Sequence, residues 1–503
     1  MPSTIATSTS DEVIPLWING ESVNSKDLKK FPVVSAKNDD QTVHYALSTN
    51  VEYAIKACDS AAIAFETWRN TLAVERRDIL LRAAEIILER KDAFVKTQME
   101  ETSATEFWAS TNIKTGVAHI REIASNITSL TGVIPQSRLD YALAFREPIG
   151  VTLAIPPWNA PIVLGARALC TPLAAGCAVV LKASELSPKT HHMLVQALFD
   201  AGLPKNVVSI VQADREDAPA VTEALISHPA IRKVEFIGSA PIGRIIGAIA
   251  GKYLKPVLME LGGKCAVIVL EDADLEDAAF KTIIAAYNHH GQVCFSTDRV
   301  YVMRNVADKF IELLKTNASR FPIGGAVSQR LVQGAAAKLK DAEQKGAKFL
   351  YGSSEYADKS SAALTPSIIT NVTKDMDIFD EESFSPSVAV YIVDDQEEAL
   401  KLVNASSYGL VGAVHTKDLH RGIDLARRME TGIAHVNGMT AFDECKSRIL
   451  CFPGFRMNLT FPQATLPLGG AKNSGWGRTN GLWGLDNFSV LKLVTISTKP
   501  GLP

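Results

Sequence analysis

From about residue 150 to residue 261, hydrophobic positions alternate between short continuous runs and helical spacing. The short runs predict buried strands, and the segments with apolar residues three or four positions apart predict helices between them. Strands alternating with helices predict a parallel, doubly wound α/β sheet with a ligand crevice at the carboxyl ends of its strands. The expected strands are "GVTLAI", "AVVLKA", "VVSIVQ", "KVEFIGS" and "PVLMEL", and the expected helices are residues 161–175, a helix starting at Ser187 and Pro188, residues 217–227 and a helix starting at Pro241.

A second series of the same kind begins near residue 265 and predicts a second α/β domain. Its expected strands are "CAVIVL", "RVYVM", "PSVAVYIV", "GLVGAVHT" and "GIAHVNG". Upstream, residues 74–100 carry apolar side chains at helical spacing and predict one long amphipathic helix. Residues 137–149 and 485–498 read as short strands outside both series.

The composition is that of a soluble globular protein with two or three domains. The chain has 503 residues, of which 47% are hydrophobic and 21% charged. A net charge of −3 predicts no general attraction to nucleic acid or to an anionic membrane. We find neither a signal-peptide pattern at the N-terminus nor an apolar stretch long enough to span a bilayer, so a cytoplasmic location is expected.

The seven cysteines are scattered, with no spacing typical of metal ligands, so no metal site is predicted. Their odd number fits free thiols in a reducing compartment, where one thiol can serve as a nucleophile and the others as small core residues. They are Cys58, Cys170, Cys177, Cys265, Cys294, Cys445 and Cys451.

Three residues are candidates for catalysis, although each also has a structural interpretation. Cys294 follows a glycine-containing turn at the end of the expected helix 274–290 in "HHGQVCFSTDR". Glu260 ends a strand in "MELGGK", where a carboxylate faces the crevice and can act as a base or instead cap a helix. Asn159 follows Pro-Trp in "IPPWNAP", where its amide can donate to an oxyanion or simply form a turn.

Other segments suggest contacts to a phosphate-bearing ligand. "FIGSAPIGR" supplies Gly238 and Gly243 between a strand and a helix N-terminus, which suits a pyrophosphate, although the spacing is not that of the usual dinucleotide fingerprint. Lys182 and Glu185 follow a strand, where they can hold ribose hydroxyls. "EESFSP" sets Glu382 beside Phe384, and "PLGGAKNSGWGR" is a glycine-rich crossing or hinge.

Taken in order, these motifs resemble those of the NAD(P)-dependent aldehyde dehydrogenase superfamily, from about Trp17 to Ser497. The shared signatures are Pro-Trp-Asn, Lys-x-x-Glu, Phe-x-Gly-Ser, Glu-Leu-Gly-Gly-Lys, Gly-Gln-x-Cys, Glu-x-Phe-x-Pro and Gly-Gly-x-Lys-x-Ser-Gly. The resemblance implies an aldehyde dehydrogenase-like fold. Such a fold has a Rossmann-like, doubly wound parallel cofactor domain, a second α/β catalytic domain and a small protruding β element for oligomerisation.

The resemblance also implies roles for individual residues. Cys294 would attack the aldehyde to form a hemithioacetal and then a thioester, Asn159 would stabilise the oxyanion, and Glu260 would activate the hydrolytic water. Glu185 would bind ribose hydroxyls and repel a 2′-phosphate, which favours NAD over NADP. The implied cofactor-binding residues are Ile155, Pro157, Trp158, Lys182, Glu185, Gly238, Ser239, Gly243, Leu261, Gly262, Glu382 and Phe384.

The motifs are most similar to the salicylaldehyde and vanillin (aromatic aldehyde) dehydrogenase branch. In that interpretation Leu164 and Arg167 face the substrate entrance, where the arginine can bond a ring hydroxyl or instead pair structurally. Tyr287, Val293 and Phe295 would add aromatic or apolar walls. The alternatives are an aliphatic aldehyde or semialdehyde dehydrogenase and a catalytically impaired member of the family.

The resemblance further predicts the division of the chain and a homodimer or homotetramer. Residues 10–130 and 150–261 would form the NAD-binding domain, and residues 262–481 the catalytic domain. Residues 131–149 and 482–499 would form the oligomerisation element.

Residues 445–463, "CKSRILCFPGFRMNLTFPQ", read as an insertion beside the substrate tunnel. Two cysteines without a histidine make a poor metal site. Our hypothesis is that the segment is a translated, unspliced intron. Codons for Cys-Lys-Ser can contain a splice donor, and codons for Asn-Leu-Thr can contain a branch point. If the segment belongs to the mature protein, we expect a surface excursion that narrows access to Cys294.

Overall fold

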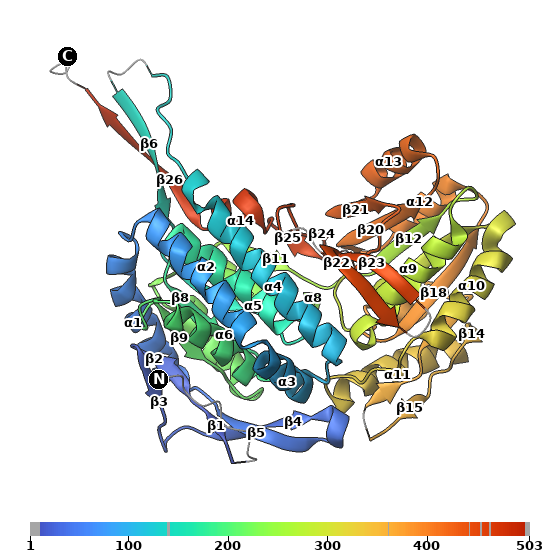
Figure 1. Ribbon diagram of the computed structural model, residues 1–503, viewed down its shortest axis with the longest axis horizontal. Helices are drawn as coiled ribbons and strands as arrows, with labels where there is room; N and C mark the ends of the chain where they lie inside the picture. Colours follow the sequence, from blue (N-terminus) through green and yellow to red (C-terminus); the bar gives the residue numbers. More distant parts are fainter. Residues whose placement is uncertain are drawn as a thin grey trace.

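The computed structural model describes residues 11–137, 141–360, 362–441, 443–452, 455–461 and 464–497. Figure 1 shows two α/β lobes side by side and a two-stranded ribbon that projects from one of them. No helix among the described residues is long and apolar enough to cross a membrane.

The first lobe is built on an eight-stranded sheet of order β25-β11-β10-β7-β8-β9-β2-β3, whose five central strands are parallel. Chain order runs outward from β7 in both directions, so the sheet is doubly wound, as the alternating pattern predicted, with its switch point between β7 and β10. The strands are β2 (Leu16–Ile18), β3 (Glu21–Val23), β7 (Val151–Ile155), β8 (Val179–Lys182), β9 (Val208–Val211), β10 (Ile231–Ile237), β11 (Val257–Glu260) and β25 (Gly475–Trp476).

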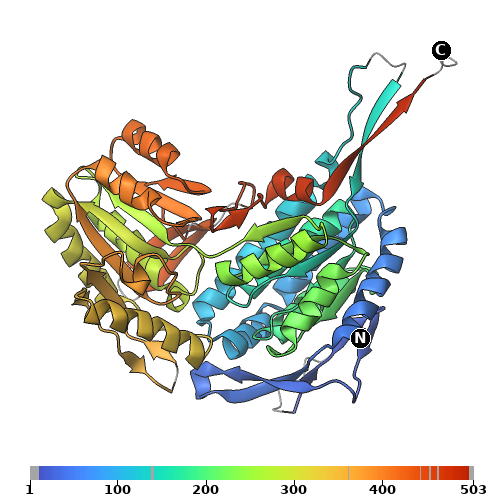
Figure 2. The same cartoon turned by 180° about the vertical axis from the view of Figure 1, so that it is seen from behind.

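Helices cover both faces of this sheet (Figures 1 and 2). On one face α2, α4, α5 and α6 contact one another, and on the other α7 contacts both α1 and α8. The bounds are α1 (Val51–Trp68), α2 (Ala73–Glu89), α3 (Lys91–Thr102), α4 (Glu106–Asn126), α5 (Pro161–Ala175), α6 (Pro188–Asp200), α7 (Ala218–Ser227) and α8 (Ala240–Lys252).

The single helix predicted over residues 74–100 is two helices in the structure. Arg90, at φ −102° and ψ 17°, leaves the helical conformation between α2 and α3. The change of direction lets both helices pack on α4, and this tertiary contact is not visible in the hydrophobic spacing.

The second lobe holds a seven-stranded sheet of order β14-β17-β18-β13-β12-β20-β21, parallel except for β14. Its strands are β12 (Cys265–Val269), β13 (Thr297–Met303), β14 (Lys348–Tyr351), β17 (Ser367–Thr370), β18 (Ser387–Val393), β20 (Val411–His415) and β21 (Ile433–Val436). The helices are α9 (Leu275–Tyr287), α10 (Ala307–Arg320), α11 (Gln329–Gln344), α12 (Gln396–Asn404) and α13 (Leu419–Arg428).

The projecting ribbon pairs β6 (Tyr141–Pro148) with β26 (Ser489–Ile496) in antiparallel register, so the two strand segments predicted outside both series lie together. A helix, α14 (Gly481–Asn487), precedes β26. Smaller strands are β1 (Val13–Ile14), β4 (Lys30–Ser35), β5 (Gln41–Leu47), β15 (Tyr356–Asp358), β16 (Ala363–Leu364), β19 (Tyr408–Gly409) and β24 (Ala471–Lys472).

Most of the suspected insertion forms an antiparallel hairpin of β22 (Asp443–Phe452) and β23 (Phe455–Phe461). Residues 453–454 and 462–463 of the segment lie outside the described residues. The origin of the segment stays a prediction, since a backbone path does not distinguish an intron product from a native loop.

Candidate active site

Cys294 lies on a tight loop between α9 and β13. The loop begins with a turn over Asn288–Gly291, in which His289 and His290 adopt left-handed φ values of 50° and 58°. Gly291 follows at φ 72°, and a Cβ there would lie 2.1 Å from the carbonyl oxygen of Ser385, so only glycine fits this approach. The loop directs the half-buried Cys294 side chain toward the first lobe.

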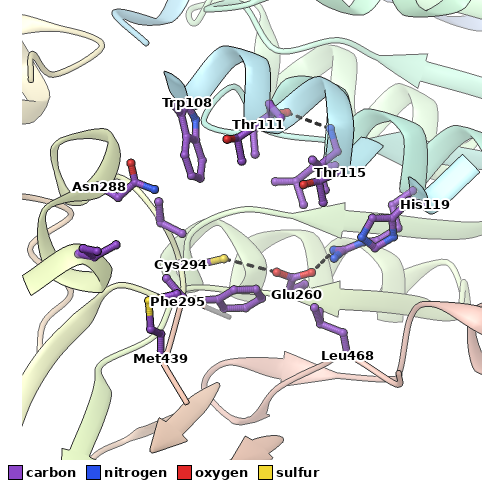
Figure 3. A pocket seen from close by; sticks show the side chains of 18 of the residues that line it. Trp108, Thr111, Thr115, His119, Glu260, Asn288, Cys294, Phe295, Met439 and Leu468 are labelled. Carbon is purple, nitrogen blue, oxygen red and sulfur yellow. Dashed lines mark hydrogen bonds and ion pairs between the residues drawn. The ribbon is translucent and has the colours of Figure 1, made fainter. Parts of the chain in front are cut away.

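Glu260 meets the Cys294 thiol from the other lobe, at the carboxyl end of β11. The thiol donates a hydrogen bond to Oε1 of Glu260 at 3.5 Å (Figure 3). Burial raises the pKa of Cys294, and the charge of Glu382 raises it further, while the Arg167 guanidinium opposes both. The resting thiol is therefore protonated, with a carboxylate in position to accept its proton.

Arg167 comes from α5 and forms an ion pair with Oε2 of Glu260. Both side chains are buried, at 2% and 3% exposure. The guanidinium is thus held beside the carboxylate, which is the structural pairing that the sequence left open as the alternative to bonding a ring hydroxyl. Its Nε has no hydrogen-bond partner among the described residues.

Asn159 follows β7 and is buried against the cysteine loop. The Asn159 side-chain Nδ2 donates to the backbone carbonyl of Gln292 at 3.0 Å. The backbone carbonyl of Asn159 accepts a hydrogen bond from the Trp108 indole at 2.9 Å. A primary amide carries two N–H groups, so one remains for a second acceptor.

Cys294, Glu260 and Arg167 border a cavity between the lobes, which Figure 3 shows at close range. Asn159 directly precedes another lining residue, Ala160. Of the five residues predicted for the substrate pocket, Leu164, Arg167, Val293 and Phe295 line this cavity. The remaining lining residues are Phe107, Trp108, Thr111, Asn112, Thr115, His119, Ala160, Val163, Glu260, Ile284, Asn288, Cys294, Met439, Ala441 and Leu468.

Tyr287 is a correction to the predicted pocket, because its ring lies in the core of the second lobe. The side chain is 2% exposed, and its hydroxyl donates to the carbonyl of Ser367 at 3.0 Å. Tyr287 ends α9, and the turn of the chain that follows directs the next residue, Asn288, to the cavity instead.

Sequence reasoning missed the wall that α4 contributes. Phe107, Thr111, Thr115 and His119 recur every fourth residue and so share one face of this helix. The periodic spacing was a usable signal, but nothing in the sequence indicated that this face packs beside Cys294. Figure 3 shows three of these residues, Thr111, Thr115 and His119, across the cavity from Cys294.

The predicted cofactor residues gather at the carboxyl edge of the first sheet. Ile155 ends β7, Lys182 ends β8, Gly238 and Ser239 follow β10, and Leu261 and Gly262 follow β11. Burial lowers the pKa of Lys182, while the nearby Glu185 charge opposes this effect.

The start of α8 lies close to the strand edge, as a dinucleotide site requires. Ser239 is the N-cap but makes no side-chain cap bond, which leaves N–H groups of the first helical turn available. A Cβ at Gly243 would lie 2.6 Å from Cδ2 of Leu261, so a glycine is needed for this packing.

Glu382 and Phe384 reach the same crevice from the second lobe. Oε1 of Glu382 accepts from the backbone N–H of Gly263 at 3.2 Å, and a Cβ at Gly262 would lie 2.3 Å from Oε2. Burial raises the pKa of Glu382 to about 8. The Phe384 ring makes an edge contact with Trp158, with ring centroids 6.0 Å apart. Within the part of the chain that the structure describes, no cluster of His, Cys, Asp and Glu suits a metal ion.

Comparisons with known proteins agree with this arrangement. A profile of the Aldehyde dehydrogenase family matches residues 22–494. The chain is 36% identical to a vanillin dehydrogenase of a Pseudomonas species, across 97% of this chain and 98% of that protein. It is 34% identical to a salicylaldehyde dehydrogenase of Pseudomonas putida, across 96% and 97%.

Among solved structures, a salicylaldehyde dehydrogenase from Pseudomonas putida G7 complexed with salicylaldehyde superimposes with a TM-score of 0.90 at 32% identity. The alignment covers 98% of this chain and 100% of that one. These matches confirm the fold class and the resemblance predicted from the motifs. The chain belongs to the aldehyde dehydrogenase family, whose members oxidise aldehydes with NAD or NADP.

Proposed function

We propose that the protein oxidises hydroxylated aromatic aldehydes to carboxylic acids with NAD, through a thioester on Cys294. The observation that carries the proposal is the meeting of the Cys294 thiol and the Glu260 carboxylate at one cavity with aromatic and apolar walls. The Asn159 amide lies beside them, bonded to the backbone of the loop that carries Cys294.

The chemistry follows from what each side chain can do. Glu260 takes the thiol proton, and the Cys294 thiolate attacks the aldehyde carbon. The free N–H of Asn159 and the backbone N–H of Cys294 stabilise the oxyanion, and one such donor is worth about 3–4 kcal/mol. Glu260 releases the thiol proton to solvent before hydrolysis. After oxidation it takes a proton from water, whose oxygen attacks the thioester carbon. The carbon–sulfur bond breaks, and the leaving Cys294 thiolate regains a proton from Glu260.

The crevice residues fit a nicotinamide dinucleotide, which when bound accepts the hydride. Ser239 and the α8 N-terminus would hold the pyrophosphate, and Lys182 and Glu185 the adenosine ribose. Glu382 would bind the nicotinamide ribose beside Phe384 and Trp158. The negative charge of Glu185 supports NAD over NADP, because it repels a 2′-phosphate.

Two features of the cavity support a hydroxylated aromatic substrate. Phe107, Trp108 and Phe295 supply flat apolar contact area for a ring. Thr115 Oγ1 is a buried polar atom that has no partner among the described residues. The relatives named above act on vanillin and salicylaldehyde, both hydroxylated benzaldehydes.

The test is NADH formation by the purified protein with NAD and a panel of aldehydes. We expect kcat/KM for hydroxybenzaldehydes to exceed that for hexanal and succinic semialdehyde, and Cys294→Ala to abolish activity. Cys58→Ala, in α1 and away from the cavity, is the matched control and should stay active. Equal turnover of hexanal would reject the aromatic assignment, and activity in Cys294→Ala would reject the nucleophile.

We also infer a homodimer or homotetramer built through the β6–β26 ribbon. Support comes from its exposed apolar side chains, which a lone ribbon leaves in water. They are Tyr141, Phe145, Val490, Leu491, Leu493, Val494 and Ile496.

A further inference from the structure

A row of buried charges extends from Cys294 along the face of the first sheet that α5 covers. Glu260 on β11 pairs with Arg167 on α5, and two residues of β10, Glu235 and Lys233, continue the row. All four side chains are at most 6% exposed. Buried charges are costly unless they are paired, so their grouping at one place calls for a physical account.

The strand register places the two carboxylates on the same face. Ile237 of β10 is the partner of Glu260, and Glu235 lies two residues earlier on that strand. Side chains two positions apart point the same way, as do side chains of paired residues. Glu235 and Glu260 therefore lie on neighbouring strands with their side chains on the same face of the sheet. A long arginine side chain between them can reach either one.

The hydrogen-bond pattern of Arg167 is incomplete. Its Nε has no partner among the described residues, and neither has Oε2 of Glu235. The positive charge of Arg167 nevertheless acts on Glu235. One guanidinium thus serves two carboxylates and is hydrogen-bonded to only one of them.

The surroundings of Glu235 leave it as the group that titrates near neutral pH. Burial raises its pKa to about 7, while Arg167 and Lys233 oppose the effect. From α4, burial lowers the pKa of His119 to about 3, so this imidazole is neutral. The neighbouring strand β7, "VTLAI", brings no titratable side chain. Lys233 donates a hydrogen bond to the backbone carbonyl of Asn487 at 2.7 Å, which holds its ammonium group in place.

We propose that Glu235 is a positioning residue that acts through Arg167. Ionised Glu235 draws the guanidinium from Glu260 and frees that carboxylate to take the proton of the hydrolytic water. With Glu235 protonated, Arg167 stays on Glu260 and lowers its basicity. This inference rests on the proposed role of Glu260 as the base. It is measured at hydrolysis of the thioester, although the same carboxylate also takes the thiol proton.

The experiment separates the two steps in the holoenzyme. Rapid mixing with NAD and 4-hydroxybenzaldehyde reports thioester formation as an NADH burst, and hydrolysis as the following steady rate. In Glu235→Gln we expect the burst to persist. Hydrolysis at pH 8 should fall about tenfold, which is part of the roughly 100-fold to 10,000-fold that a general base contributes. The increase of the hydrolysis rate between about pH 6 and 8 should be smaller in this variant, because Glu260 is then the anionic partner of Arg167 at every pH.

Glu235→Asp should restore both the rate and the pH profile. Glu216→Gln, a surface carboxylate with 82% of its side chain exposed, should behave as the parent. An unchanged hydrolysis profile in Glu235→Gln overturns the inference, as does loss of the burst amplitude, because hydrolysis would then no longer be the slowed step. If Glu235→Gln does not fold, the pH profile of the parent tests the inference by itself. A parental hydrolysis rate without an inflection near pH 7 overturns the inference. A parent that forms no NADH would instead refute the proposed function. A parent that forms NADH steadily but without a burst overturns the inference alone, because hydrolysis of the thioester then does not limit turnover.

Discussion

At Cys294, burial and a neighbouring carboxylate act on the pKa of the thiol in one direction, and a neighbouring guanidinium acts in the other. Desolvation and the carboxylate of Glu382 favour the protonated form, and the Arg167 guanidinium favours the thiolate. The thiol is therefore unreactive at rest and depends on Glu260 for activation. The same arginine contacts the base, so one side chain influences both reacting groups.

Gly262 offers a residue-scale test of the cofactor crevice. In Gly262→Ala the new Cβ would lie 2.3 Å from Oε2 of Glu382 and displace that carboxylate. Because small misplacements of a positioning group can cost up to about 100-fold, we expect kcat/KM for NAD to fall by roughly 10–100-fold. Steady-state kinetics with varied NAD measures the effect.

Gly251→Ala is the matched control for this change. It lies in α8 with no atom within 4 Å of a new Cβ, so it should leave the kinetics unchanged. It should also stabilise the fold by about 0.5–1 kcal/mol. If Gly262→Ala keeps the parental kcat/KM for NAD, the assignment of Glu382 to the cofactor site is wrong.

At the scale of elements, the β6–β26 ribbon is the clearest candidate for an interface. Leu491 and Leu493 are 61% and 62% exposed on one side of β26. Large apolar side chains gathered on a two-stranded ribbon are typical of a surface that another chain covers.

Replacing Leu491 and Leu493 by lysine should lower the oligomeric mass, because charged side chains would have to be buried. Sedimentation or light scattering measures the mass of the parent and the variant. The control replaces Ile63 and Leu254, exposed at 69% and 90% on separate elements, by lysine and should keep the parental mass. A monomeric parent, or a ribbon variant of unchanged mass, would contradict the interface.

At the scale of the whole molecule, the active site exists only where the two lobes meet. Cys294 comes from the second lobe, whereas Glu260 and Asn159 come from the first. The β22–β23 hairpin begins at Asp443, two residues after Ala441, and Ala441 lines the same cavity. An unneeded segment at this point would affect the site more than one at a distant surface.

Deleting residues 445–463 should therefore yield a folded protein with kcat/KM for 4-hydroxybenzaldehyde at least equal to that of the full chain. NADH formation and thermal unfolding measure the two properties, and sequencing of the mature transcript tests the origin of the segment. A transcript that retains these codons would reject the intron hypothesis, and loss of activity on deletion would assign the hairpin a role.

The sequence by itself determined the two α/β series, the family and the order of its motifs. Hydrophobic period and turn residues are local properties, so strands, helices such as Pro161–Ala175 and the ribbon segments were predictable. The family match then implied roles for residues whose chemistry depends on short motifs. The division of residues into domains and most site roles stay predictions, since they await the experiments above.

Only the tertiary structure decided which side chains meet. Arg167 and Glu260 are separated by 93 positions, yet they form a buried ion pair. The face of α4 that lines the cavity and the turn that directs Tyr287 into the core likewise depend on how distant elements pack. Such contacts depend on the relative positions of helices and sheets, and the hydrophobic pattern of one segment contains no information about the neighbour that will cover it.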